Sequence, residues 1–438
     1  MTQNLTQQAP ETGALSTGHI PGTDLNVQLR DVREAQELLE GVIVPTPMEH
    51  SRALGRMMNA TVHLKAENLQ RAGSFKVRGA YVRMARLSDE EKARGVVAAS
   101  AGNHAQGVAL AAKKLGISAK IYMPRGVALP KLAATRDHGA EVILQGSTVD
   151  ESLREAQRYA SETGAVFIHP FNSTDVVAGQ GTIGLEVLDQ EPEVDTVLMG
   201  IGGGGLLAGS AVAIKQEAAR RGRTVRIIGV QAENAAAYPP SLAADALVPI
   251  KGVRTIADGI AVGQPGEIPF EIIKELVDDV VTVSEDAIAQ ALIFLLERSK
   301  MVVEPAGAVG VAAMLEGKLS GLGLRGEEAA KNIVAVLSGG NIDPMLMMRV
   351  IQHGLAAADR FLSVKLMLKD RPGELAMIAR LIAESDANVI GVDHNPIGRD
   401  LSMGDVSIVI NMETKGEEHS ALVLNSLRAE GYEPLAIH

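Results

Sequence analysis

The sequence contains no cysteine. This absence excludes disulfides, zinc sites built on thiolates, iron–sulfur clusters and a cysteine nucleophile. The chain also lacks an apolar run long enough to span a bilayer, and its first residues lack the basic-then-apolar order of a signal peptide. These absences predict a soluble cytoplasmic protein with no membrane partner.

Basic charge is also scarce. Lys plus Arg number 42 against 53 for Asp plus Glu, which gives a net charge of -11. The chain has no compact basic run, so we expect no nucleic-acid partner. Apolar residues make up 46% of the 438 residues, which is enough for packed cores in about two to three domains.

Most of the chain alternates between short apolar runs and helical periodicity. We expect a mobile tail over residues 1–25, followed over 26–352 by an α/β unit that is large enough to be a catalytic domain. Buried strands are predicted at 96–100, 119–123, 141–144, 196–200, 225–230 and 333–337. Helices between them, such as 104–115, 152–162 and 206–220, imply parallel sheets. The length suggests two lobes, with a smaller lobe at roughly 60–165 inserted in the larger one.

The C-terminal residues, 361–438, follow a different pattern. Residues 361–369 alternate between apolar and polar, and an amphipathic helix stripe follows the turn at 370–373. Two more strands, a helix near 417–430 and a last strand complete the order βαββαβ. This order predicts a separate ferredoxin-like domain, with the boundary near 352–360.

A glycine-rich turn follows one predicted strand and precedes a helix. Residues 200–205 read GIGGGG, and such a turn suits a phosphate, although a plain strand-to-helix turn is an alternative. Gly200, Gly202 and Gly205 also match the G-x-G-x-x-G dinucleotide pattern. That pattern needs an acidic residue about 20 positions later, and only Glu233 is available. A nicotinamide dehydrogenase therefore stays as an alternative.

A lysine occupies the first turn of another predicted helix. The surrounding sequence is AGSFKVRGA, in which Ser74 could cap the helix that carries Lys76. A cation at this end of a helix is unfavourable unless an anion neutralises it or a Schiff base consumes it. Lysine condenses with carbonyls once its pKa is lowered. A solvated surface lysine is the alternative.

Two more polar segments follow predicted strands. Ser100 opens SAGNHAQG, which suits a carboxylate or forms an ordinary helix cap, and Ser338 opens SGGN. Because the carboxyl ends of parallel strands gather at one edge of a sheet, these segments and the glycine turn should converge. A phosphate, a carboxylate and a carbonyl next to Lys76 describe pyridoxal phosphate carrying an amino acid.

Six motifs in order carry a resemblance to a known family over about residues 27–350. They are AENLQRAGSFKVRGA, ASAGNHAQGVA, GGGGLLAG, TIADGIAVGQPG, VVEPAGAVG and LSGGNID. Together they resemble the threonine dehydratase (threonine ammonia-lyase) family, which belongs to the tryptophan-synthase-β-like class of pyridoxal-phosphate enzymes. The resemblance implies a two-lobed parallel-sheet catalytic domain. The C-terminal unit resembles an ACT domain, with DRPGEL at 370–375.

By this resemblance Lys76 carries pyridoxal 5'-phosphate as a Schiff base and then removes the substrate Cα proton. The other implied contacts are Phe75 on the pyridine face, Asn103 on the 3'-oxygen, Gly202, Gly203, Gly204, Gly205 and Leu206 on the phosphate, Ser338 on the ring nitrogen, and Ser100, Ala101, Gly102 and His104 around the substrate carboxylate. The implied reaction converts L-threonine to 2-oxobutanoate and ammonium, and L-serine to pyruvate.

Some positions narrow this interpretation. Relatives that racemise serine carry a second Ser where this chain has Ala101, which has no proton to move, so racemisation is disfavoured. Serine racemase or another amino-acid lyase remains the runner-up. The relatives that racemise serine also bind a divalent cation after the strand that matches residues 225–230. This chain has the uncharged residues Gln231, Ala235 and Ala237 in that region, so we predict no metal there. Glu304 is expected to balance a nearby cation, Lys300 or Arg298, and to have no catalytic role.

The resemblance to ACT domains implies pairing into a homodimer or homotetramer and an amino-acid effector, isoleucine or valine. Gly373, Asn388 and Gly391 are the residues expected near that effector. A dimerisation module without a ligand and a non-catalytic amino-acid sensor are alternatives. Isoleucine would suit the first step of isoleucine biosynthesis, whereas the catalytic part looks more like the catabolic type.

Overall fold

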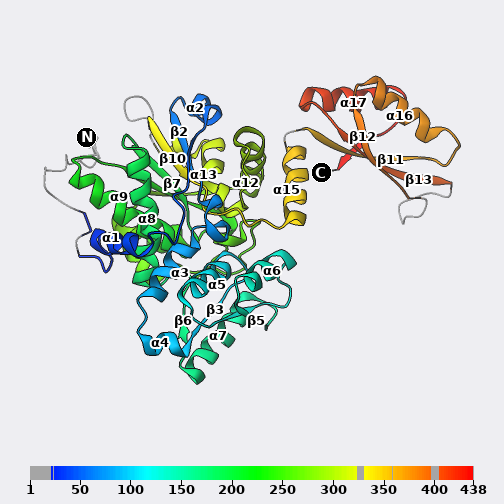
Figure 1. Ribbon diagram of the computed structural model, residues 1–438. Helices are drawn as coiled ribbons and strands as arrows, with labels where there is room; N and C mark the ends of the chain where they lie inside the picture. The colour runs from blue at the N-terminus through cyan, green and yellow to red at the C-terminus, as the bar shows by residue number, and fades with distance from the viewer. Residues whose placement is uncertain (1–20, 23, 323–329, 358, 396–403, 438) are drawn as a thin grey trace, which may run out of the picture.

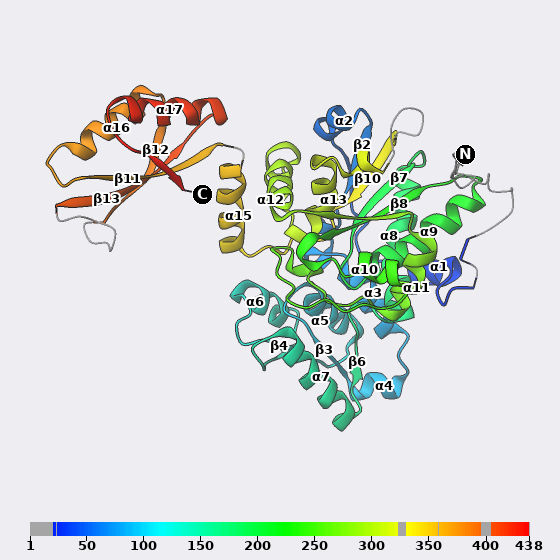
Figure 2. The same ribbon diagram turned by 180° about the vertical axis from the view of Figure 1, so that it is seen from behind.

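The computed structural model describes residues 21–22, 24–322, 330–357, 359–395 and 404–437. Residues 1–20 and 23 of the predicted tail lie outside the described residues. The described part forms a two-lobed body and a smaller C-terminal domain, which stands to one side and is joined to the body through α15 (Pro344–Ala357) (Figure 1; Figure 2 shows the reverse side).

The large lobe is built on a six-stranded sheet. Its strands, in spatial order, are β1 (Met48–His50), β2 (Thr61–Lys65), β10 (Asn332–Val336), β7 (Thr196–Gly200), β8 (Arg226–Ala232) and β9 (Asp279–Val283). Only the edge pair β1–β2 is antiparallel among these pairings. Val334 and Val336 enter one hydrophobic core, and Ile333 and Ala335 enter the core on the opposite face. Burial on both faces explains why the central strands read as unbroken apolar runs.

Helices cover both faces of this sheet. On one side lie α1 (Leu29–Leu38), α8 (Thr174–Gln190), α9 (Gly205–Arg220) and α11 (Glu267–Leu276), and on the other lie α12 (Glu285–Phe294) and α13 (Pro305–Leu315). The shorter helices of this lobe are α2 (Arg52–Met58), α10 (Tyr238–Ala244) and α14 (Lys318–Gly321). This two-sided arrangement confirms the predicted α/β architecture.

The small lobe holds a second, wholly parallel sheet. Its order is β5 (Glu141–Leu144), β4 (Ala119–Met123), β3 (Val96–Ala99) and β6 (Val166–Phe167). The helices around it are α3 (Lys76–Ala85), α4 (Asp89–Arg94), α5 (Asn103–Leu115), α6 (Leu129–Asp137) and α7 (Val149–Thr163). The predicted strands at 119–123, 141–144 and 196–200 have the bounds that the structure shows.

The predicted start of the small lobe near residue 60 is wrong. Strand β2 pairs in parallel with β10, so residues 61–65 belong to the large sheet. The amphipathic pattern of β2 identifies a strand, but it contains no information on which sheet the strand joins. The partner strand lies 271 positions later in the sequence, since Thr61 pairs with Asn332.

The C-terminal domain has the predicted βαββαβ order. Its elements are β11 (Phe361–Lys369), α16 (Glu374–Glu384), β12 (Asn388–Asn395), β13 (Asp405–Glu413), α17 (Glu417–Ala429) and β14 (Leu435–Ile437). The antiparallel sheet has the order β12-β13-β11-β14. Leu362, Val364, Leu366 and Leu368 alternate inward as predicted and form a core with Ile378 of α16.

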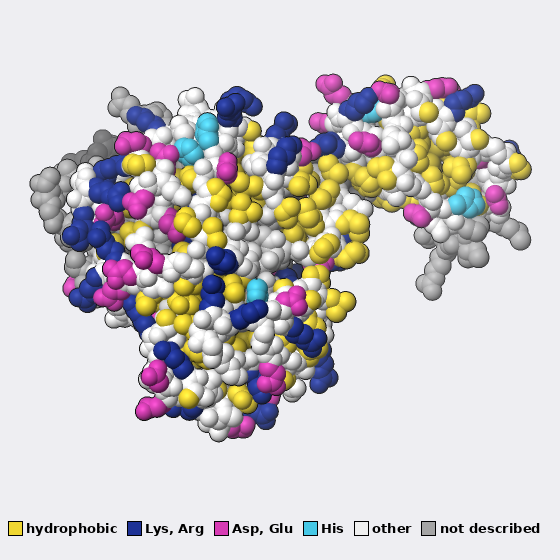
Figure 3. All heavy atoms as spheres, viewed as in Figure 1, with side chains coloured by type: hydrophobic (Ala, Val, Ile, Leu, Met, Phe, Trp, Pro, Cys, Tyr) yellow, Lys and Arg dark blue, Asp and Glu magenta, His cyan; other side chains and the backbone are white. Residues whose placement is uncertain are grey.

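Apolar side chains gather on the surface around α15 and on the C-terminal domain (Figure 3). The exposed large apolar residues there include Met345 and Met348 of α15, Met367 of β11 and Leu435 of β14. Across the described residues, every helix is too short or too polar to cross a membrane.

Candidate active site

Lys76 begins α3, which packs against α5 of the small lobe and α8 of the large lobe. Its Nζ donates a hydrogen bond of 3.2 Å to the carbonyl oxygen of Pro170 and lies 5.0 Å from the centre of the Phe75 ring. Desolvation lowers the pKa of Lys76 to about 8, while the negative charge of Glu304 opposes this shift. Such an amine is a base and a nucleophile near neutral pH, which argues against a solvated surface lysine.

The glycine turn joins β7 to α9, as predicted. Gly204 caps α9 with a φ of +99°, which residues with a side chain rarely adopt. A Cβ on Gly203 would lie 2.3 Å from the Phe171 ring, and a Cβ on Gly204 would lie 2.0 Å from the Tyr238 hydroxyl oxygen. The turn must therefore be bare backbone, and the first N–H groups of α9, which have no acceptor inside the helix, can approach an anion.

Two adjacent residues bring Lys76 and the glycine turn together. Pro170 accepts the hydrogen bond from Lys76, and the ring of Phe171 lies against Gly203. A Cβ on Gly205 would also lie within 3.1 Å of Phe171. The amine and the anion-binding turn thus border the same place, although their residues are more than a hundred positions apart in the sequence.

The glycine turn is braced from behind. The hydroxyl of Tyr238 donates to the carbonyl oxygen of Gly203 at 3.2 Å. Gln231, which is fully buried, donates from Nε2 to the carbonyl oxygen of Ile201 at 3.3 Å and accepts from the Tyr238 N–H at 2.9 Å. Gln231 therefore serves as an uncharged structural brace. The prediction that no metal binds at this position remains a prediction.

The segments after β3 and β10 meet at Asn103. Its Oδ1 accepts from Nδ2 of Asn341 at 2.9 Å, and its Nδ2 donates to Oε1 of Glu304 at 2.6 Å. The carbonyl oxygen of Ser338 accepts from the Phe75 N–H at 3.2 Å, so this segment also borders the lysine. The segments after β3 and β10 therefore lie next to each other and next to the start of α3.

The expectation that Glu304 balances Lys300 or Arg298 is wrong. Glu304 is only 3% exposed and precedes α13, whereas Lys300 Nζ donates to the carbonyl oxygen of Glu297. Burial, assisted by the charge of Asp258, raises the pKa of Glu304 to about 7. The sequence signal was available, because Glu304 is the only charged residue in the apolar stretch 301–315.

The segment that begins at Ser100 is only partly buried before α5. The Ser100 hydroxyl accepts from the Gly102 N–H at 3.1 Å, and Ala101 presents a methyl group between them. The side chain of His104 turns away to the carbonyl oxygen of Ile168 at 2.8 Å. Burial lowers the pKa of His104 to about 3, helped by the charge of Lys76, so the ring is neutral. A carboxylate would meet the backbone N–H groups here and not a histidine cation.

Sequence reasoning missed Phe171, Tyr238 and His169. His169 Nδ1 accepts from the N–H of Asn172 at 2.9 Å, and burial together with the Lys76 charge lowers the His169 pKa to about 4. The cluster HPFN at 169–172 was the available signal, since it sets two aromatic rings and an amide between predicted elements in a chain with few aromatics.

A two-lobed α/β fold with a desolvated lysine beside a bare glycine turn defines a pyridoxal-phosphate enzyme. The comparisons agree. The chain belongs to the family described as "Pyridoxal-phosphate dependent enzyme", which matches residues 39–339. Enzymes of this family use pyridoxal phosphate, and so does this protein.

The relatives of the chain carry more specific names. It is 46% identical over 407 residues to the "L-threonine ammonia-lyase" of Thermotoga maritima, covering 93% of this chain and 98% of the relative. It is 44% identical over 322 residues to the catabolic L-threonine dehydratase of Escherichia coli (strain K12), covering 73% of this chain and 94% of the relative. The structure of maize serine racemase superposes with a TM-score of 0.69 at 34% identity, covering 76% of this chain and 98% of that one.

The residues present fit the cofactor. The glycine turn is bare backbone, because a Cβ on Gly203 or Gly204 would collide with Phe171 or Tyr238, and Lys76 supplies a desolvated amine next to it. The buried hydroxyl of Ser74, two residues before Lys76, has no hydrogen-bond partner among the described residues. Asn103 adds an amide that is held in place at both ends.

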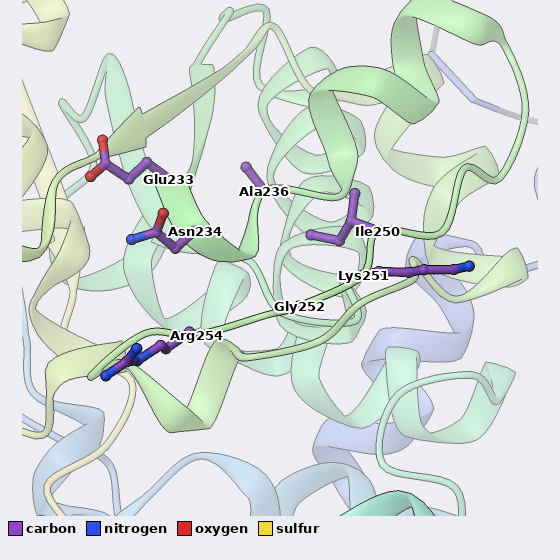
Figure 4. A pocket seen from close by; sticks show the side chains of 7 residues that line it. All are labelled: Glu233, Asn234, Ala236, Ile250, Lys251, Gly252 and Arg254. Atoms are coloured by element: carbon purple, nitrogen blue, oxygen red, sulfur yellow. The ribbon is translucent and has the colours of Figure 1, made fainter.

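A separate surface pocket of about 440 Å³ lies beyond the end of β8. Glu233, the acidic residue considered for a dinucleotide, lines this pocket with Lys251 and Arg254. Lys251 and Arg254 point away from each other (Figure 4), so they do not converge on one ligand. Glu233 lines this pocket, whose lining residues include none of the glycine turn, so the pocket gives the nicotinamide interpretation no support.

Of the residues predicted for an effector, Asn388 and Gly391 both lie on β12, whereas Gly373 lies apart from them within one copy of the chain. Gly373 precedes α16, next to the end of β11. Asn388 begins β12 and lies level with Glu413, which pairs with Phe361 at the start of β11. The nine residues of β11 place Gly373 and Asn388 at opposite ends of the sheet, on the order of 25 Å apart.

Proposed function

We propose that this protein is an L-threonine ammonia-lyase that converts L-threonine to 2-oxobutanoate and ammonium, and also L-serine to pyruvate. The observation that carries the proposal is the Lys76 amine, whose pKa is lowered to about 8 and which borders the glycine turn through Pro170 and Phe171. The names of the relatives from Thermotoga maritima and Escherichia coli support the substrate.

The site residues divide the work by their chemistry. Lys76 binds the cofactor and moves the proton at the substrate Cα, because its neutral form is accessible near pH 8. When bound, pyridoxal phosphate supplies an electron-withdrawing ring that delocalises the charge left at that carbon. Phe75 would pack on the ring face, the amides of Gly202–Leu206 would hold the phosphate, and Ser338 would offer a neutral hydroxyl to the ring nitrogen.

The substrate carboxylate lies on the segment from Ser100 to His104. The backbone N–H groups at the start of α5 favour an anion there, and Ser100, Ala101 and Gly102 shape the space around it. Water is lost across Cα and Cβ and is returned when the product hydrolyses to the oxo acid and ammonium.

Lys76→Ala tests the assignment, with Lys114→Ala on the exposed end of α5 as the matched control. We expect Lys76→Ala to lose the yellow visible absorbance that bound pyridoxal phosphate gives and all measurable turnover of threonine, because Lys76 is the amine that borders the glycine turn through Pro170 and Phe171. Lys114→Ala should retain both. A colourless wild-type protein that binds NAD would contradict the proposal, as would turnover that survives in Lys76→Ala.

Ala101 favours the lyase over the structurally similar serine racemase. Its methyl group cannot donate or accept a proton on the face of the substrate opposite Lys76. The wild-type protein should therefore form pyruvate from L-serine with no accumulation of D-serine, measured by chiral chromatography. Ala101→Ser should leave elimination largely intact; D-serine formed by the wild type would favour the racemase.

The C-terminal domain suggests regulation and assembly. The Thermotoga maritima relative matches 93% of this chain, so the match extends into this domain, whereas the match to the shorter catabolic enzyme covers 73%. We propose that the domain pairs with a second copy in a homodimer or homotetramer and binds isoleucine or valine. The separation of Gly373 from Asn388 agrees with a ligand held between two copies. A cytoplasmic location and a role in isoleucine biosynthesis complete the proposal.

A further inference from the structure

A buried carboxyl group occupies a fitted space behind the predicted cofactor position. The N–H of Glu304 donates to the carbonyl oxygen of Gly339 at 3.0 Å, which fixes its backbone. A Cβ on Gly339 would lie 2.4 Å from Glu304 Oε1, and a Cβ on Gly259 would lie 3.3 Å from the same atom. Two glycines thus leave room for this carboxyl, and a side chain at either position would crowd it.

This carboxyl determines the orientation of the Asn103 amide. Asn341 Nδ2 is a donor that is anchored on the carbonyl oxygen of Ala72 at 2.7 Å, so the Asn103 atom facing it must be the oxygen. The other end of the amide must then be the nitrogen, which donates to Glu304 at 2.6 Å. A flipped amide would set donor against donor on one side and acceptor against acceptor on the other.

We propose that Glu304 is a positioning residue for the cofactor, because it holds the Asn103 amide so that the second N–H of Nδ2 is kept for the 3'-oxygen of the pyridoxal ring. The Asn103 nitrogen has two N–H groups, and among the described residues it donates to Glu304 alone. The inference rests on the role of Asn103 in the proposed function. It assigns Glu304 an indirect part in cofactor binding, through Asn103.

The charges around Glu304 make its hold on Asn103 depend on pH. Glu304 faces Asp258 of η4 (Asp258–Ile260), Lys131 of α6 and Lys76 of α3. Its pKa of about 7 is raised by burial and by Asp258, and it is lowered by Asn103, Lys131 and Lys76. An ionised carboxylate is a stronger hydrogen-bond acceptor than a protonated one. The Asn103 amide is therefore held more firmly as pH rises through about 7.

A double-mutant cycle tests whether Glu304 acts through Asn103. The dissociation constant of pyridoxal phosphate is measured by absorbance titration of the apoprotein for wild type, Glu304→Gln, Asn103→Ala and the double variant at pH 8. Each single change should weaken binding about tenfold, the effect of losing one charge-assisted or cofactor hydrogen bond. The double variant should bind no more weakly than Asn103→Ala. Glu275→Gln, on the exposed face of α11, is the matched control and should bind as wild type does.

The pH profile of the same titration provides a second readout. The wild-type step near pH 7 should disappear in Glu304→Gln. Asp258→Asn should move the step to lower pH, because it removes a charge that raises the Glu304 pKa. Lys131→Met should move it to higher pH, because it removes a charge that lowers this pKa.

Additive losses in the cycle, or a step near pH 7 that is unchanged in Glu304→Gln, would overturn the inference; the separate rise near pH 8 that Lys76 gives should remain in both proteins. Failure of the proposed function is distinguishable, since it would appear as a wild-type protein that binds the cofactor but does not turn over threonine. In that case the cycle and the pH step would still report on Glu304 and Asn103, because they measure binding and need no substrate.

Discussion

Replacing Gly204 by alanine should damage both the fold and the cofactor site. Gly204 has a φ of +99°, and a left-handed conformation costs a residue with a side chain about 1–2 kcal/mol. The new Cβ would lie 2.0 Å from the Tyr238 hydroxyl oxygen and 2.7 Å from Pro269, and such overpacking typically costs about 1–3 kcal/mol more. We therefore expect Gly204→Ala to lose about 2–5 kcal/mol of unfolding free energy.

Gly222→Ala is the matched control, because Gly222 also has a positive φ, +69°, but has no atom within 4 Å of the added Cβ. Its expected loss is only the conformational part, about 1–2 kcal/mol. Guanidinium unfolding of both variants measures the difference, and titration of the apoproteins with pyridoxal phosphate measures the site. Gly204→Ala should weaken cofactor binding at least about tenfold, since displacement of Tyr238 removes the brace on Gly203. Equal destabilisation of the two variants with unchanged cofactor binding would refute the crowding argument.

Three further predictions follow from the structure. Arg78 is fully buried and forms ion pairs with Glu67 at 2.8 Å and with Glu186 at 2.6 Å. Arg78→Met should therefore lower the free energy of unfolding by about 3–5 kcal/mol in guanidinium, whereas the exposed control Arg158→Met should lower it by less than about 1 kcal/mol. Similar losses in the two variants would contradict the role of the buried ion pairs. The pKa of Lys76 is lowered to about 8, so the rate at which the apoprotein takes up pyridoxal phosphate should rise with pH through about 8 and then level off. A rate that keeps rising toward pH 10 would indicate a lysine with an ordinary pKa. A chain truncated after Arg360 keeps α15 packed against α12 and should retain threonine turnover. Its initial rates should no longer respond to isoleucine or valine. A response that persists would place the effector site outside the C-terminal domain.

The buried strands of the catalytic unit could be predicted closely from the sequence. The run at 196–200 is largely apolar because a parallel strand inside the sheet buries both faces, and such a run ends where the chain leaves the sheet. The glycine turn and Lys76 could also be predicted as chemical groups. The residue types limit the chemistry that each group can carry out. Glycine backbone can approach an anion closely, and a lysine in the first turn of a helix needs its positive charge neutralised.

Partners distant in the sequence could not be predicted in the same way. Strand β2 has an ordinary strand pattern, and only its pairing with β10 assigns it to the large sheet. Gly373 and Asn388 are both loop or strand-end residues of one small domain, but the parallel direction of β11 and β12 separates them along the sheet. The local sequence pattern indicates whether a residue is buried or exposed, but it does not indicate which distant residue lies next to it in the fold.

The amino-acid sequence by itself determined the α/β class, the C-terminal βαββαβ unit, the lysine and the glycine turn, because each depends on residue types at short spacing. Only the tertiary structure decided that Phe171 and Tyr238 shape the glycine turn and that Glu304 lies beside Asn103. It also decided the protonation of these groups. The pKa values of Lys76, His104 and Glu304 depend on how much water the surrounding protein removes and which charges remain nearby, and packing of the two lobes sets both.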